Sequence, residues 1–119
     1  MFSVKVELEF SAAHNLRGYK GKCEELHGHN WKVQVVAAKD KLDNSGMLID
    51  FRLLKSALKR ALDELDHRYL NKIPYFKKEN PTSENIARYI FLRLKRRIPQ
   101  IKEVTVWESE KCAATYDGE

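Results

Sequence analysis

The sequence contains little cysteine and no long apolar run. Two cysteines, Cys23 and Cys112, are too few for a disulfide framework, so both are expected to be free thiols in a reducing compartment, with Cys112 as a small buried residue. No apolar stretch approaches the ~20 residues of a membrane-spanning helix, and residues 1–5 alternate apolar and polar instead of forming the apolar core of a signal peptide. These absences predict a cytoplasmic protein without a membrane partner.

Charge is abundant but spread along the sequence. Charged residues make up 33% and hydrophobic residues 43% of the sequence, a balance typical of a soluble globular protein. The length of 119 residues suffices for one core and predicts a single domain over residues 1–119. The net charge is +5, but the densest basic run, residues 93–97, lies on a predicted helix and is interpreted as a solvated face. Nucleic acid is therefore disfavoured as a partner, and a small phosphorylated substrate accounts equally well for the basic excess.

Alternating apolar and polar residues predict strands at both ends of the chain. Residues 2–10 place every second, apolar side chain on one face and polar or charged side chains on the other, the pattern of a half-buried strand. A second strand is predicted over residues 30–38, after a loop that contains glycines and lysines. Two more are predicted over residues 103–109 and 113–117.

Two helices are predicted between these pairs of strands. Asp50 is a suitable N-cap, and the apolar residues that follow it recur at helical spacing until the helix ends near residues 66–67. Thr82 or Ser83 can cap the second helix, which ends before Pro99.

This order of elements predicts an α+β fold, in which two helices cover one face of an antiparallel four-stranded sheet. Such a sheet has two unpaired edges, and the outer face of its first strand is polar and charged. Joining the sheets of several copies edge to edge would remove the unpaired edges and enclose the polar face. The sequence therefore predicts an oligomer.

Histidine is scarce, and three of the four histidines are candidates for one metal site. His27 and His29 point to the same side of an extended chain, and Gly28 between them permits an unusual backbone angle. His14 follows the first strand, and hairpin pairing can bring it to the same end of the sheet. Three imidazoles without an obvious fourth protein ligand indicate a catalytic zinc site, which keeps one position open for water or substrate.

Cys23 lies four residues before His27 and allows two interpretations. As a fourth zinc ligand it would make the site structural. As a thiol near positive charge it would ionise more readily and could act as a base or nucleophile. The spacing alone does not decide between them.

Two further polar positions also allow two interpretations each. Asp66 and His67 close the first predicted helix, where a histidine either complements the helix dipole or supplies acid-base chemistry near neutral pH. Glu108 shares strand parity with Val104 and Val106, so it should face the apolar side, where a carboxylate needs a partner such as the N–H and amino groups of a flat heterocycle. The alternative for Glu108 is a strand-end position exposed to water.

Several of these segments occur together in an order that is typical of one family. Over nearly its whole length the chain resembles the 6-pyruvoyltetrahydropterin synthase family, and the combination of motifs is far more specific than any single one. The segments that carry the resemblance are Phe10-Ser11-Ala12-Ala13-His14, Cys23-Glu24-Glu25-Leu26-His27-Gly28-His29-Asn30, Leu48-Ile49-Asp50-Phe51, Leu65-Asp66-His67-Arg68-Tyr69-Leu70-Asn71, Asn80-Pro81-Thr82-Ser83-Glu84-Asn85 and Glu108.

The resemblance implies a tunnelling fold (T-fold), in which three subunits close their sheets into a β-barrel and two trimers form a homohexamer. The active sites of such an assembly lie at subunit interfaces. The resemblance also implies that His14, His27 and His29 hold zinc, which would bind the hydroxyl groups of the substrate side chain. Cys23 would then be the general base and not a zinc ligand.

The remaining site residues also take their expected roles from this resemblance. Asp66 and His67 would form a relay that handles protons on the other side of the substrate. Glu108 would be a catalytic residue that also anchors the pterin ring. Thr82 and Ser83 would contribute to recognition of that ring.

The interval between the cysteine and His-Gly-His resembles that of the bacterial queuosine-pathway branch of the family. It implies conversion of 7,8-dihydroneopterin triphosphate to 6-carboxy-5,6,7,8-tetrahydropterin, acetaldehyde and triphosphate, with Arg17, Lys20 and Lys22 as candidate triphosphate contacts. Members that make pyruvoyltetrahydropterin typically have a longer interval, and a folate branch uses a glutamate near the position of the cysteine, where Glu24 follows Cys23 here. These two reactions are alternatives on the same site. A zinc-stabilised binding module without catalysis is the alternative outside the family.

Overall fold

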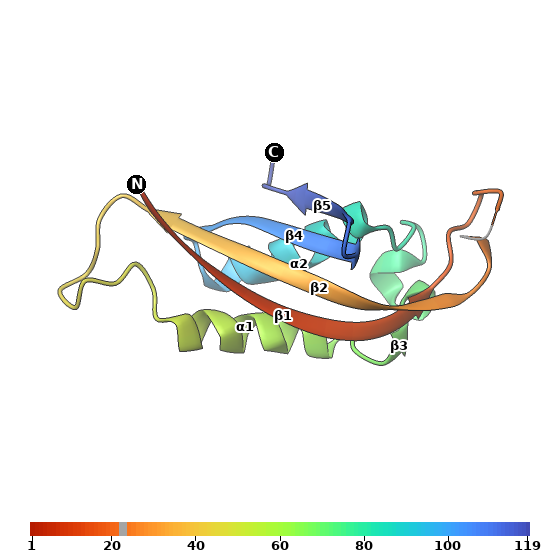
Figure 1. Ribbon diagram of the computed structural model, residues 1–119, viewed down its shortest axis with the longest axis horizontal. Helices are drawn as coiled ribbons and strands as arrows, with labels where there is room; N and C mark the ends of the chain where they lie inside the picture. Colours follow the sequence, from red (N-terminus) through yellow and green to blue (C-terminus); the bar gives the residue numbers. More distant parts are fainter. Residues whose placement is uncertain (22–23) are drawn as a thin grey trace.

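The computed structural model describes residues 1–21 and 24–119 of the chain. Over those residues the chain forms one five-stranded sheet, two α-helices and two short 3₁₀ turns (Figure 1). The molecule is elongated, 53 × 25 × 24 Å, and β1 and β2 run along its length. In chain order the elements are β1 (Phe2–His14), β2 (His27–Lys39), α1 (Phe51–Asp63), β3 (Arg68–Tyr69), η2 (Leu70–Lys72), η3 (Pro74–Phe76), α2 (Ser83–Arg97), β4 (Ile101–Ser109) and β5 (Cys112–Tyr116).

The sheet has the strand order β3-β1-β2-β4-β5. Neighbours among β1, β2, β4 and β5 are antiparallel, which confirms the prediction for these four strands. The short strand β3 was not predicted. It pairs in parallel with Ala12 and Ala13 at the β1 edge of the sheet, and two residues are too few to show a period-2 pattern.

The first two strands are longer than the sequence predicts. They pair without interruption from Phe2 opposite Lys39 to His14 opposite His27. The predicted strands are shorter because the contrast between apolar and polar faces fades where small residues such as Ala12 and Ala13 occupy both faces. The additional length places all three candidate histidines on paired strands.

Both helices begin at the predicted caps. The Asp50 side chain accepts a hydrogen bond from an amide in the first turn of α1, and Thr82 does the same for the Asn85 amide in α2, at 3.1 Å. Helix α1 ends at Asp63, a little before the predicted end near residues 66–67. No helix in the described part of the chain is long and apolar enough to cross a membrane.

The hydrophobic core lies between the helices and one face of the sheet, as the order of elements predicts. Helix α1 packs on β1, α2 packs on β4 and β5, and the two helices contact each other. The opposite face of β1 carries the exposed side chains of Lys5, Glu7 and Glu9. The largest fully buried apolar side chains are those of Trp31, Leu54, Leu58, Leu65, Leu70, Phe76, Ile86, Tyr89, Ile90 and Ile101.

The prediction that Cys112 is a buried filler is wrong, because its side chain is exposed at the start of β5. This strand lies at the far edge of the sheet, and its residues are all exposed or only half-buried. Cys112 pairs with Ser109 of β4 on one side only, because no strand of the described sheet lies beyond β5.

Adjacent leucines in α1 provide a test of this packing. Leu54 is fully buried, whereas the side chain of Leu53 is 56% exposed. Leu54→Ala should therefore lower the free energy of unfolding by about 2–5 kcal/mol, because it leaves a cavity in the core. Leu53→Ala should change it by less than about 0.5 kcal/mol. Urea denaturation measures both, and equal losses for the two variants would contradict the packing of α1.

Candidate metal centre

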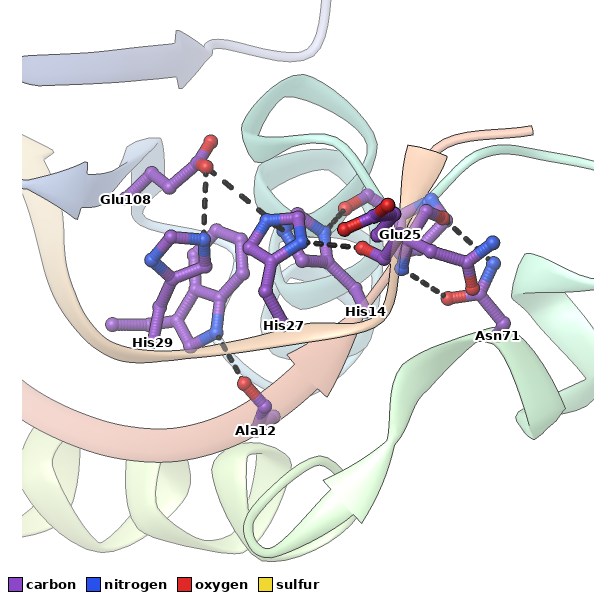
Figure 2. Close-up of polar contacts among 10 residues, drawn as sticks. Ala12, His14, Glu25, His27, His29, Asn71 and Glu108 are labelled. Carbon is purple, nitrogen blue, oxygen red and sulfur yellow. Dashed lines mark hydrogen bonds and ion pairs between the residues drawn. The ribbon is translucent and has the colours of Figure 1, made fainter. Parts of the chain in front are cut away.

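Three imidazoles meet at one end of the β1–β2 pair. His14 is the last residue of β1 and lies directly opposite His27, the first residue of β2, and His29 follows on the same face of β2. The ring centroids of His14 and His27 are 4.6 Å apart, and those of His27 and His29 are 4.7 Å apart. Figure 2 shows the three rings side by side. The structure thus brings the three predicted residues together.

Glu108 adds a carboxylate to this cluster. It projects from the end of β4 toward the histidines (Figure 2), and its Oε1 atom lies 3.0 Å from Nε2 of His29 and 3.9 Å from Nε2 of His14. One potential ligand atom from each of the four residues lies within 4.8 Å of the others, so the group could hold a metal ion. Strand parity predicts this facing direction for Glu108, but the sequence reasoning did not group it with the histidines.

Two backbone carbonyls fix the ring tautomers of His14 and His27. Nδ1 of His14 lies 2.7 Å from the Pro81 carbonyl oxygen, and Nδ1 of His27 lies 2.7 Å from that of Glu25. A carbonyl oxygen only accepts hydrogen bonds, so each Nδ1 carries a proton, and a ring that carries this one proton presents a lone pair at Nε2.

These lone pairs make the cluster suited to a cation. The Nε2 atoms of His14 and His27 are only 3.0 Å apart, and two lone pairs at this distance repel each other unless a proton or a cation is shared between them. Nε2 of His29, although close to Glu108, is buried without a well-aligned hydrogen-bond partner among the described residues. Neutral imidazole nitrogens with a carboxylate oxygen are ligands that zinc accepts, so the residues present fit this metal.

Burial keeps two of the rings in the form that binds metal. Loss of hydration on burial is the main cause that lowers the pKa of His14, opposed by the hydrogen bond to Pro81 and reinforced by the neighbouring His27. Burial likewise lowers the pKa of His29, against the opposing effect of the Glu108 carboxylate. Both rings are therefore neutral at pH 7, and a metal ion need not compete with a proton there.

Trp31 forms the wall behind the imidazoles. It lies on the same face of β2 as His29, it is fully buried, and its ring meets those of His14 and His29 edge to face at centroid distances of 4.9 and 5.2 Å. Its indole N–H donates to the Ala12 carbonyl oxygen at 3.3 Å. The sequence reasoning did not single out this residue, although its place two positions after His29 puts it on the same strand face.

Asp66 and His67 lie at the edge of the sheet beside β1. The amide of Ser11 donates to Oδ1 of Asp66 at 2.9 Å, and the amide of His67 donates to the Ser11 carbonyl oxygen at 2.6 Å. Nδ1 of His67 is 3.0 Å from Oδ1 of Asp66, and the His67 side chain is 81% exposed. The hydrogen bond from Ser11, and then the contact with His67, lower the pKa of Asp66, so this carboxyl is ionised at neutral pH.

This pair stands apart from the histidine cluster within the chain. His67 and His29 line a common hollow on the sheet surface, but among the described residues no hydrogen bond or ion pair joins Asp66 or His67 to the cluster. His67 has a left-handed backbone, with φ of 58°, which turns the chain from α1 into β3.

The other predicted site residues have varied surroundings. Thr82 caps α2 and Ser83 is buried, and both follow Pro81, whose carbonyl accepts from His14, so this segment adjoins the cluster. Arg17 uses its guanidinium for the carbonyl oxygens of Phe76 and Glu79, which leaves it less suited to a phosphate contact. Cys23, the predicted general base, and Lys22, a candidate triphosphate contact, lie outside the residues that the structure describes.

The fold and the site together define an α+β protein with a candidate metal centre where paired strands end. Residues 3–119 match the family model described as 6-pyruvoyl tetrahydropterin synthase, and the chain belongs to this family. It is 39% identical over 122 residues, covering 98% of the chain and 93% of the relative, to a Synechocystis protein named 6-carboxy-5,6,7,8-tetrahydropterin synthase. It is 37% identical over 105 residues, covering 86% of the chain and 85% of the relative, to a Pyrococcus furiosus protein named dihydroneopterin monophosphate aldolase.

The solved structure of Caenorhabditis elegans 6-pyruvoyl tetrahydropterin synthase has the same fold. It superposes with a TM-score of 0.91 at 34% sequence identity, covering 99% of this chain and 96% of that one. This similarity confirms the predicted tunnelling fold and the family that the motifs resemble.

Metal binding by the cluster can be measured directly. The purified protein should bind one Zn²⁺ per chain. Loss of a residue that only orients a metal ligand typically lowers the affinity by about 10–100-fold, and His27→Ala, which removes a ligand itself, should lower it by more. His67→Ala is the matched control and should retain the affinity of the wild type, because His67 is outside the cluster. Competition with a chromophoric chelator measures the affinities. Equal affinities for wild type and His27→Ala would exclude the cluster as the metal site.

Stability of the metal-free protein should fall as the pH falls below about 6.5. The pKa values of His14 and His29 in the folded state lie below the ordinary 6.5. As the pH falls, these rings therefore become protonated in the unfolded state before they do so in the folded state. Unfolding should therefore take up as many as about two protons just below this pH. Urea denaturation with a chelator at pH 7.5 and 5.5 tests this, and His29→Gln should flatten the dependence. Stability that is constant or increases toward pH 5.5 would contradict it.

Proposed function

We propose that this protein is a zinc-dependent lyase. It takes up 7,8-dihydroneopterin triphosphate and water and releases 6-carboxy-5,6,7,8-tetrahydropterin, acetaldehyde and triphosphate. The reaction would take place in the cytoplasm as a step in queuosine precursor synthesis. The assignment to this branch of the family is based on the short interval between Cys23 and the pair His27 and His29.

One observation carries this proposal. The cluster offers neutral imidazole nitrogens and one carboxylate at a single point, and it does so in a chain that is 39% identical to a named 6-carboxy-5,6,7,8-tetrahydropterin synthase. If the three imidazoles alone hold the zinc, a fourth position would stay open for a substrate oxygen.

The cluster would serve both the metal and the substrate. Zinc held by His14, His27 and His29 would stabilise negative charge that develops on side-chain oxygens of the substrate. Glu108 is 35% exposed, so its carboxylate is accessible from the open side of the cluster and can accept hydrogen bonds from the N–H and amino groups of a pterin ring. Thr82 and Ser83, next to the carbonyl that holds His14, would line the same region.

Proton transfer would use groups on two sides of the substrate. In this proposal Cys23, four residues before His27 in the sequence, removes a proton from the substrate side chain as general base. Asp66 is held by the Ser11 amide and keeps Nδ1 of His67 oriented, so that the exposed imidazole can exchange protons on the opposite side.

The proposal includes a homohexamer. The exposed charged face of β1 and the open edge at β5 support an assembly in which sheets join edge to edge. The separation of Asp66 and His67 from the cluster also supports it, because a site at a subunit interface could combine the pair of one chain with the cluster of another.

Product identification tests the proposed reaction. The zinc-loaded protein should convert dihydroneopterin triphosphate to equal amounts of 6-carboxytetrahydropterin and acetaldehyde, measured by mass spectrometry and by trapping of the aldehyde. Cys23→Ala should keep its zinc and its fold but lose turnover by about 10²–10⁴-fold, because it lacks the proposed base. Zinc content and circular dichroism of the variant provide the control.

Other outcomes would each favour a different function. Pyruvoyltetrahydropterin without acetaldehyde would indicate triphosphate elimination, and a hydroxymethylpterin would indicate cleavage of the kind named for the Pyrococcus relative. Absence of turnover, together with loss of zinc and unfolding in Cys23→Ala, would indicate a zinc-stabilised binding module.

A further inference from the structure

The chain leaves the sheet immediately after a candidate metal ligand. Strand β1 ends at His14, so the backbone groups of the residues that follow have no partner strand of the regular ladder. Backbone N–H and C=O groups that leave a sheet need other partners, and those of the half-buried Asn15 and the exposed Arg17 find them in two asparagine side chains.

Asn71 holds the residue next to His14. Its Oδ1 atom accepts a hydrogen bond from the Asn15 amide at 3.0 Å, and its Nδ2 atom donates to the Asn15 carbonyl oxygen at 2.8 Å (Figure 2). Asn71 is only 8% exposed and belongs to η2, directly after β3. The segment formed by β3 and η2 therefore contacts the end of β1 twice. Its backbone pairs with Ala12 and Ala13, and the side chain of Asn71 binds Asn15.

Asn80 repeats the same arrangement at Arg17. The Arg17 amide donates to Oδ1 of Asn80 at 3.0 Å, and Nδ2 of Asn80 donates to the Arg17 carbonyl oxygen at 2.9 Å. Asn80 is itself held, because its carbonyl oxygen accepts from Nδ2 of Asn85 at 2.9 Å. The residue after Asn80 is Pro81, whose carbonyl accepts from the His14 ring.

We propose that Asn71 and Asn80 are positioning residues for the metal centre. They fix the backbone on the C-terminal side of His14, so that Nδ1 of this ring meets the Pro81 carbonyl and Nε2 faces His27. Without them the end of β1 is free to fray, and a metal ion must order His14 when it binds. Groups that hold a ligand in place ahead of binding raise affinity by reducing this ordering cost.

This inference rests on the proposed metal centre and makes a separate prediction. Asn71→Ala should weaken zinc binding by about 10–100-fold, the effect typical of residues that orient a metal ligand. Asn80→Ala should weaken it less, because Asn80 holds the chain two residues farther from His14 than Asn71 does. The Co²⁺-substituted protein, whose visible spectrum reports ligand geometry, should show altered bands in Asn71→Ala.

Two controls separate positioning from loss of stability. Leu94→Ala removes a buried side chain near the other end of α2 and should lower the melting temperature at least as much as Asn71→Ala. It should nevertheless bind zinc as the wild type does. Tyr69→Phe removes the hydrogen bond from Tyr69 to the Asn15 side chain, at 2.6 Å, but leaves both bonds from Asn71, and it too should retain the wild-type affinity.

The outcomes distinguish this inference from the proposed metal centre. A wild-type protein that binds neither Zn²⁺ nor Co²⁺ would overturn both. If the wild type binds zinc and the affinity of Asn71→Ala is within twofold of the wild-type affinity, the positioning role alone is overturned. The same conclusion follows if Leu94→Ala loses as much zinc affinity as Asn71→Ala does. If Asn71→Ala does not fold, the partly exposed Asn80 carries the test: an unchanged zinc affinity in Asn80→Ala overturns the inference, and a loss that Leu94→Ala does not share supports it.

Discussion

The pairing of β1 with β2 in one register is the constraint on which both the core and the candidate metal centre depend. Successive side chains of a strand alternate between its faces, so a slip of one residue would move every side chain of one strand to the opposite face. Phe10 opposite Trp31, stacked at 5.9 Å and both buried, holds this register in the core. The same register sets His14 opposite His27. Packing of the apolar face thus determines the geometry of the polar site at its end.

Burial brings groups together in the histidine cluster that are unfavourable neighbours. The core that excludes water from His14 and His29 also disfavours their charged forms and lowers their pKa values. Carbonyl oxygens on the outer nitrogens of His14 and His27 then direct two lone pairs toward each other, beside the Glu108 carboxylate. These groups repel one another or lack partners, so a bound cation would relieve an unfavourable arrangement that the fold imposes.

The connections between regular elements supply side chains and carbonyl groups that bind the end of β1. The turn after α1 supplies Asp66, which is tied to β1, and the segment after β3 supplies Asn71. The segment before α2 supplies Asn80 and the Pro81 carbonyl. These residues lie outside the long strands and helices, yet their hydrogen bonds fix the C-terminal end of β1, where His14 lies, and the residues that follow it. The stability of these connections and the order of the site are therefore linked.

The sequence by itself determined both helices and four of the five described strands, their order, the Asp50 cap, the common facing of His27 and His29, and the family, because each depends on local periodicity, short-range capping or contiguous motifs. It did not determine the parallel strand β3, the exposure of Cys112 or the meeting of Glu108 with the histidines. Those features join residues that are far apart along the chain or depend on what covers an edge strand. Only the folded arrangement decides them, because alternation along a strand sets which face a side chain occupies but not which distant residue it meets.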